Sequence, residues 1–103
     1  MKKNWFVPAV GAAVLLAAGI ANASDTLSPA ELDPLVKSGR VLPLDALQDA
    51  ALDKHHGGRI KEGEIQRHKD GYIYEVEVTD RDGNEWDMDI DATTGLLLKD
   101  EKD

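Results

Sequence analysis

The stretch from Gly71 to Lys99 alternates apolar and acidic residues, which is the pattern of a β-sheet with two different faces. Successive side chains of a strand point to opposite sides, so residues two apart share a face. One set is apolar: Tyr72, Tyr74, Val76, Val78, Trp86, Met88 and Ile90. The residues between them supply carboxylates: Glu75, Glu77, Glu85, Asp87, Asp89 and Asp91. The pattern predicts strands with one face toward a core and one acidic face outside it.

Three turn signals and a leucine run set the limits of these strands. Lys69-Asp70-Gly71, Asp82-Gly83 and Thr93-Thr94-Gly95 combine polar residues with glycine, which is typical of hairpin turns. Leu96 to Leu98 then predicts a short last strand before the charged end, Lys99 to Asp103. We therefore expect consecutive antiparallel strands joined by hairpins.

A further strand is predicted from Arg59 to His68, but its apolar residues break the alternation. Ile60 and Ile65 are five residues apart, so a regular strand would point them to opposite faces. Gly63 lies between them, and a β-bulge at this glycine would bring both isoleucines to the core side. The sequence therefore predicts an irregular strand with a bulge at Gly63.

One amphipathic helix is predicted from Pro43 to His56. Pro43 suits the first turn, and Gly57-Gly58 supplies the glycine that commonly ends a helix. Before it, Arg40 to Leu42 fits a short edge strand or an extended lead-in. The residues expected on the buried side recur at helical spacing: Leu44, Leu47, Ala50, Ala51 and His55.

Together these elements predict an α+β fold, with one helix packed on a three- to four-stranded antiparallel sheet. The helix would cover the apolar face of the sheet and leave the acidic face uncovered. The expected core contains the helix leucines and six sheet residues: Tyr74, Val76, Val78, Trp86, Met88 and Ile90.

The first 23 residues have the layout of a secretory signal. Lys2 and Lys3 precede an apolar run, and Ala21-Asn22-Ala23 offers small residues to a signal peptidase. We expect cleavage between Ala23 and Ser24, and hence a periplasmic or secreted protein without a stable membrane anchor. An uncleaved anchor is the alternative.

Residues 24–38 contain two prolines and little periodicity, which predicts a flexible spacer with a short helical turn around Ala30 to Lys37. The domain proper is expected at residues 39–103. Without Lys2 and Lys3, ten basic residues face twenty acidic ones, a net charge of −10. This charge argues against binding to nucleic acid or to an anionic membrane surface. A small domain without cysteine must be stabilised by packing or by association, so a homodimer is one expectation.

Two patterns suggest metal binding. Asp80, Asp82, Asn84 and Asp91 fall at offsets of an EF-hand-like calcium loop, but Glu85 stands where that loop needs glycine. A hairpin turn beside an acidic strand is the interpretation we favour.

The histidines are His55, His56 and His68, and zinc would need three or four convergent ligands. A basic helix end explains the first two more simply. No nucleophile with a base, no cofactor motif and no convincing metal set is present, so we expect a protein that is not an enzyme.

The chain resembles the PepSY domain family from about Gly39 to Lys99. Three segments carry the resemblance: Val41-Leu42-Pro43-Leu44, Tyr74-Glu75-Val76-Glu77-Val78, and Asp82-Gly83 followed by Ile90-Asp91-Ala92-Thr93-Thr94-Gly95. The resemblance implies a small secreted or membrane-tethered module without catalytic residues, for which peptidase inhibition is the proposed role. A peptidase or an envelope sensor is the implied partner.

The acidic face is the candidate docking surface. Like charges on neighbouring strands destabilise a sheet, which suggests a cationic counterpart, although solubility is an equally good explanation. Its candidate partner-binding residues are Ile73, Glu75, Glu77, Glu85, Asp87 and Asp89. The alternative function is an acidic envelope protein that binds calcium or a transition metal.

Overall fold

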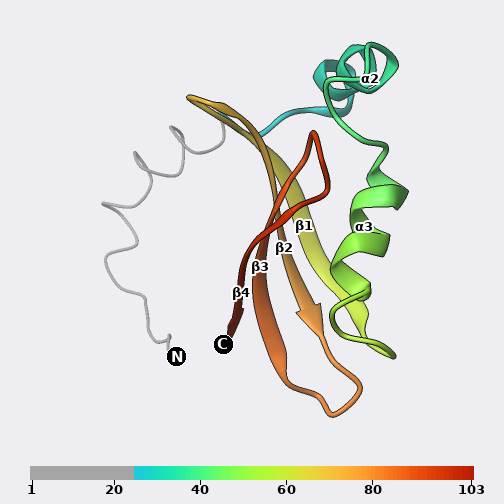
Figure 1. Ribbon diagram of the computed structural model, residues 1–103, viewed down its shortest axis with the longest axis vertical. Helices are drawn as coiled ribbons and strands as arrows, with labels where there is room; N and C mark the ends of the chain where they lie inside the picture. Colours follow the sequence, from blue (N-terminus) through green and yellow to red (C-terminus); the bar gives the residue numbers. More distant parts are fainter. Residues whose placement is uncertain (1–24) are drawn as a thin grey trace.

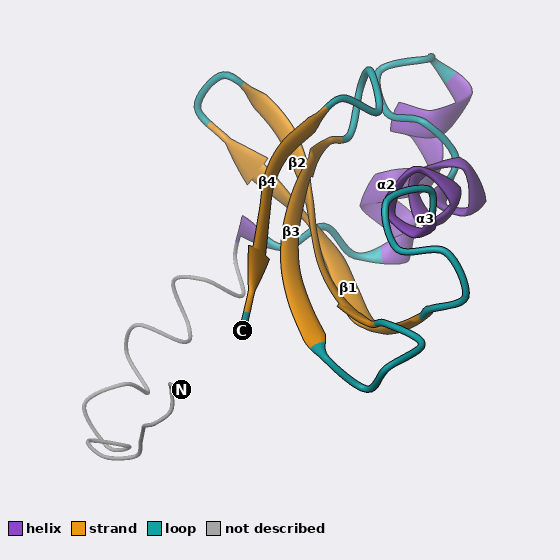
Figure 2. Cartoon of the chain, turned by 60° about the horizontal axis from the view of Figure 1, so that its bottom comes forward, coloured by secondary structure: helices purple, strands orange, loops and turns teal. Residues whose placement is uncertain are grey.

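The computed structural model of the chain describes residues 25–103, so the predicted signal segment lies outside the described residues. Helices and strands follow in this order: α2 (Pro29–Lys37), α3 (Leu44–Leu52), β1 (Arg59–His68), β2 (Gly71–Thr79), β3 (Glu85–Asp91) and β4 (Leu97–Lys102). The predicted α+β class is confirmed, because the helices lie on one side of an open antiparallel sheet (Figures 1 and 2).

The sheet is a meander in which each strand pairs with its neighbours in the chain, in the order β1-β2-β3-β4. All three pairings are antiparallel, as the predicted hairpins require. In the middle pair, Tyr74 lies opposite Ile90 and Val76 lies opposite Met88, so the apolar residues of both strands share one face.

Helix α3 packs against this apolar face and contacts β1, β2 and β3. The helix contributes Leu47 and Ala51, both fully buried. Leu44 was predicted to join the core, but it is 45% exposed, because the packed part of the helix begins one turn later. Trp86 is only partly buried. The buried sheet residues are Ile65, Tyr74, Val76, Val78, Met88 and Ile90.

The helical turn predicted around Ala30 to Lys37 is confirmed as helix α2, which occupies most of the segment that was expected to be a flexible spacer. Ser28 and Glu31 form a capping box, and Pro29 stands in the first turn, where its missing N–H costs nothing. Leu27 is buried and donates its backbone N–H to the carbonyl of Ile65 at 2.9 Å. The segment before α2 is thereby attached to β1.

Helix α3 ends at Leu52, four residues before the predicted end at His56. The chain then continues in turns, with the N–H of His55 bonded to the carbonyl of Leu52 and a positive φ at Gly57. Leaving the helix lets the His55 ring stack on Trp86, with ring centroids 4.4 Å apart.

Strand β1 has its predicted bounds, but its bulge is not at Gly63. The register shifts between Ile60 and Glu62, so Lys61 is the extra residue, while Gly63 pairs regularly with Val76. The bulge two residues earlier still brings Ile60 and Ile65 to the core side.

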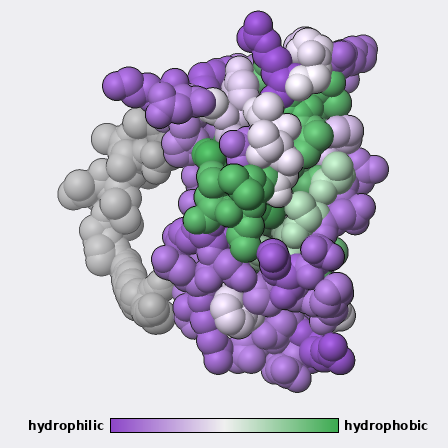
Figure 3. All heavy atoms as spheres, in the orientation of Figure 1, coloured by the Kyte–Doolittle hydropathy of each residue, from purple (hydrophilic) through white to green (hydrophobic). Residues whose placement is uncertain are grey.

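Strand β4 is longer than predicted, because it includes most of the charged end. A register shift leaves Leu98 without a direct partner, between the Ile90–Leu97 and Asp89–Lys99 pairs. Leu96 and Leu98 are 63% and 51% exposed. Figure 3 shows an apolar patch among hydrophilic atoms where β4 begins in the view of Figure 1. Among the described residues, no helix is long and apolar enough to span a membrane.

Candidate binding surface

The face of the sheet opposite α3 gathers the predicted carboxylates. Glu75 lies opposite Asp89, and Glu77 lies opposite Asp87 on the neighbouring strand. Glu85 lies two residues before Asp87 on β3, opposite Thr79. Ile73 lies at the other end of the same face, opposite Asp91. The structure therefore brings together all six predicted residues, each of them partly exposed. That they contact a partner stays a prediction.

Three further carboxylates belong to this surface and were missed in the sequence. Glu62 and Glu64 of β1 lie opposite Glu77 and Glu75, and Glu101 of β4 lies opposite Asp87. Glu62 and Glu64 line a shallow hollow of about 390 Å³ together with Glu75, Glu77, Asp87, Asp89 and Lys99. We call this surface the acidic face; its carboxylates are Glu62, Glu64, Glu75, Glu77, Glu85, Asp87, Asp89 and Glu101.

Few cations offset this charge. Lys61, the bulged residue of β1, places its Nζ 2.8 Å from Glu85 Oε2, and this hydrogen bond raises the pKa of Lys61. His68 Nε2 lies 3.4 Å from Glu75, and Lys99 Nζ lies 3.9 Å from Glu101. All of these pairs are solvent-exposed, so each contributes little to stability, and the surface stays acidic.

Glu77 is the carboxylate whose protonation is most perturbed. Burial, followed by the hydrogen bond it shares with Glu85, raises the pKa of Glu77 to about 7. Lys61 opposes this rise in pKa, and the hydrogen bond from Lys61 lowers the pKa of Glu85. Of this pair, Glu77 is therefore the carboxyl group that is protonated more readily.

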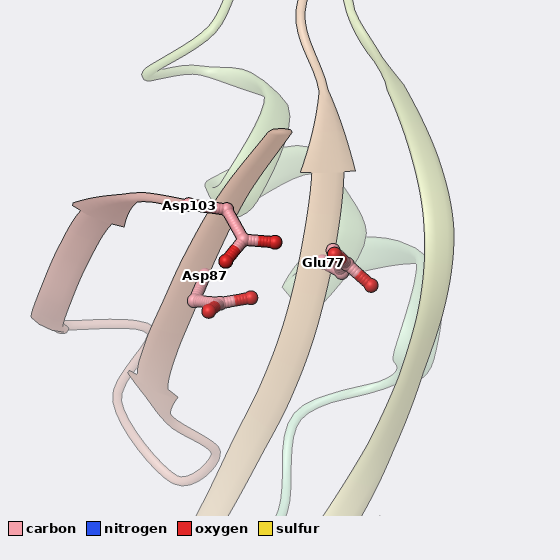
Figure 4. A group of neighbouring side chains, drawn as sticks. All are labelled: Glu77, Asp87 and Asp103. Carbon is pink, nitrogen blue, oxygen red and sulfur yellow. The ribbon is translucent and has the colours of Figure 1, made fainter. Parts of the chain in front are cut away.

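Glu77, Asp87 and Asp103 converge from three parts of the chain (Figure 4). One oxygen from each carboxylate lies within 4.8 Å of the others. Asp103 is positioned by its backbone N–H, which donates to the carbonyl of Glu85 at 2.8 Å. Oxygen donors of this kind suit calcium, which takes six to eight of them. Three carboxylates supply only part of such a shell.

The EF-hand-like spacing begins in a hairpin turn that Asp80 holds. One oxygen of Asp80 accepts the backbone N–H groups of Asp82 and Asn84, and the other accepts the indole N–H of Trp86, each at 2.9 Å. The Trp86 bond is the largest cause that lowers the pKa of Asp80 to about 2. Asp91 likewise caps its own turn by accepting the N–H of Thr93. Both aspartates therefore hold turns.

The histidines are separated by the fold. His55 Nε2 lies 2.9 Å from Asp100 Oδ1 on the helix side of the sheet, whereas His68 faces Glu75. A catalytic triad would need a nucleophile beside the His55–Asp100 pair. Within residues 25–103 the serines are Ser28 and Ser38, which cap the two ends of α2.

Comparison with known proteins gives a match to a protein family. A family model, PepSY, described as the peptidase propeptide and YPEB domain, matches residues 41–101, more than half of the chain. The match includes α3 and the strands that form the acidic face. No curated protein and no solved structure matches the chain significantly.

Proposed function

Because the chain belongs to the PepSY family, we propose that it is a non-catalytic protein-binding module that holds a peptidase or an envelope sensor on its acidic face. Peptidase inhibition is the role we favour, since the family is defined on peptidase propeptides. We place the protein in the periplasm or outside the cell, on the basis of its N-terminal sequence.

This proposal rests on the difference between the two faces of the sheet. One face packs on α3, whereas the other presents a continuous set of carboxylates around a hollow. Directly opposed carboxylates such as Glu77 and Asp87 cost some tenths of a kcal/mol per pair. A basic surface on a partner would offset that cost and would be attracted over a long range.

The test is a capture experiment with matched variants. The face variant neutralises Glu75, Glu77, Asp87 and Asp89 to the corresponding amides. The control variant makes the same charge change on the helix side, at four exposed aspartates: Asp33, Asp45, Asp49 and Asp53.

Each protein is used to capture partners from envelope extracts, and a captured peptidase is then assayed with and without it. We expect capture and inhibition by the wild type and the control, and loss of both in the face variant. Equal capture by the face variant and the control would contradict the proposal.

Metal binding is the alternative, and the convergence of Glu77, Asp87 and Asp103 favours it. Calorimetric titration with calcium, zinc and copper would detect binding in the wild type. An Asp103→Asn variant should abolish the heat if this group holds the ion. Heat that survives in that variant would place the ion elsewhere, and no heat at millimolar metal would remove this alternative.

A further inference from the structure

The two edges of the sheet are not equivalent. On β1, Thr26 forms a bridge with Gln66, and Leu27 donates its N–H to Ile65, so part of that edge is covered. The bulge at Lys61 interrupts the rest of it. On β4, by contrast, no described residue pairs with the outer edge. An uncovered edge presents backbone donors and acceptors that another strand can use.

The uncovered edge also carries the most exposed apolar side chains. Leu96 and Leu98 are the two most exposed large hydrophobic residues of the described chain, and they lie at the start of β4. Exposed apolar residues that adjoin a sheet edge are typical of a site that receives a partner segment.

The backbone of β4 can accept such a segment. Asp103 donates its N–H inward to Glu85, and residues of an antiparallel strand alternate between inward and outward bonding. The backbone groups of Lys102 and Asp100 therefore point away from β3. An added strand would pair with these groups and place alternate side chains next to Glu101 on the acidic face.

The negative charge of the protein indicates which kind of segment can pair with this edge. Two copies paired antiparallel through β4 would bring their acidic faces to the same side of one sheet, and each copy carries ten more acidic than basic residues in the described part. Self-pairing is therefore opposed by repulsion. A segment with basic residues meets the same face with attraction, and Glu101 with Asp87 directly opposite it offers two carboxylates to one basic side chain.

We propose that the outer edge of β4 receives an extended cationic segment of the partner as a fifth strand, with an apolar residue against Leu96 and Leu98 and a basic residue beside Glu101. The inference rests on the proposed function, because it names the part of the partner that the acidic face would hold. It adds that recognition requires the backbone of the segment as well as its charge.

Synthetic peptides test this directly. The probe is a nine-residue peptide that begins with leucine and alternates valine with arginine. One control peptide has glutamate in place of arginine. A second keeps the arginines but is N-methylated at alternate residues, which removes the donors needed to pair with a strand edge. Affinity is measured by fluorescence polarisation, and amide exchange of the labelled protein reports where the peptide lies.

We expect the arginine peptide to bind and to slow amide exchange at Asp100 and Lys102. N-methylation should weaken binding about tenfold, which is the loss of one to two backbone hydrogen bonds. Leu98→Ser should weaken it about fivefold, since half of a leucine surface would lose its contact. Leu44→Ser, a matched loss of an exposed leucine on α3, should leave affinity within twofold.

The outcomes separate this inference from the proposed function. If binding requires the carboxylates but is not weakened by N-methylation or by Leu98→Ser, the strand addition is refuted and the acidic face remains the site. Binding that needs the edge but survives the face variant would overturn the proposed face. No binding of the arginine peptide would overturn the strand addition, whereas the acidic face would still be judged by the capture experiment. Light scattering that shows a dimer abolished by Leu98→Ser would assign the edge to a second copy instead.

Discussion

Gly63 of β1 lies directly beneath the ring of Tyr74 on β2. A Cβ atom at position 63 would lie 2.8 Å from Tyr74 Oη and 2.9 Å from Cε1, closer than side chains approach one another in folded proteins. The ring cannot move away easily, because Tyr74 is fully buried and its hydroxyl is bonded to Gln48 of α3. The glycine therefore makes room for the largest side chain of the core.

Gly63→Ala should lower the free energy of unfolding by about 1–3 kcal/mol, the usual cost of overpacking. Alanine in place of glycine within a strand would by itself stabilise the chain by several tenths of a kcal/mol, so the contact with Tyr74 decides the sign. Urea unfolding measures the change, with Glu64→Ala as the exposed neighbour on the same strand. A variant as stable as the wild type would show that Tyr74 can shift.

The raised pKa of Glu77 predicts how the free energy of unfolding depends on pH. Its pKa is about 7 in the folded protein against an ordinary value of 4.5, so the folded state binds the proton more tightly than the unfolded state. The contribution of Glu77 to the free energy of unfolding should then fall as pH rises from about 4.5 through about 7, and it should level off above that. The groups around Glu77 are Lys61, Glu62, Glu85, Asp87 and Asp103.

Glu77→Gln should remove this dependence. We expect the variant to match the wild type near pH 4 and to be more stable near pH 8, by about 1 kcal/mol once solvent screening is allowed for. Thermal unfolding across this pH range measures the difference. Glu62→Gln, which changes the carboxylate opposite Glu77, is the control. If the stability of Glu77→Gln and that of the wild type changed in parallel with pH, Glu77 would not be the source of the pH dependence.

His55 connects the end of α3 to the sheet through Trp86 and Asp100. His55→Ala would remove a stacked ring and a hydrogen bond, and should lower the free energy of unfolding by about 1–2 kcal/mol. The adjacent His56 is exposed, so His56→Ala should change stability by less than about 0.5 kcal/mol. Equal effects at the two positions would mean that the His55 contacts add nothing.

Much of the fold could be predicted because alternation and turn residues are local signals. The bounds of β1 and the apolar and acidic faces of β2 and β3 follow from a period of two. The extent of α2 matches the predicted helical turn, but its place in a structured segment is hard to predict because Pro34 lies inside it and none of its residues is fully buried. Ser28 and Glu31, three residues apart with Pro29 between them, were the available signal of its start.

Most of the rest of the acidic face could not be predicted, because it depends on register. Glu62 joins it only because the bulge falls at Lys61, and no local pattern distinguishes that position from Gly63. Glu64 faces away from the core with either bulge, because it precedes the buried Ile65. Glu101 joins it because β4 continues through charged residues. These residues lack the alternating apolar positions by which a strand is recognised in a sequence. Pairing between strands, rather than sequence periodicity, decides the composition of this surface.

The order of the strands in the sheet has a consequence for how the chain folds. Every pairing joins strands that are consecutive in the chain, through turns such as Lys69-Asp70 and Thr93-Thr94. Bringing such strands together closes only short loops, which costs little conformational entropy. Each hairpin can form in microseconds, and the sheet can grow one strand at a time before α3 docks. We therefore expect rapid folding, with no slow search for a distant strand.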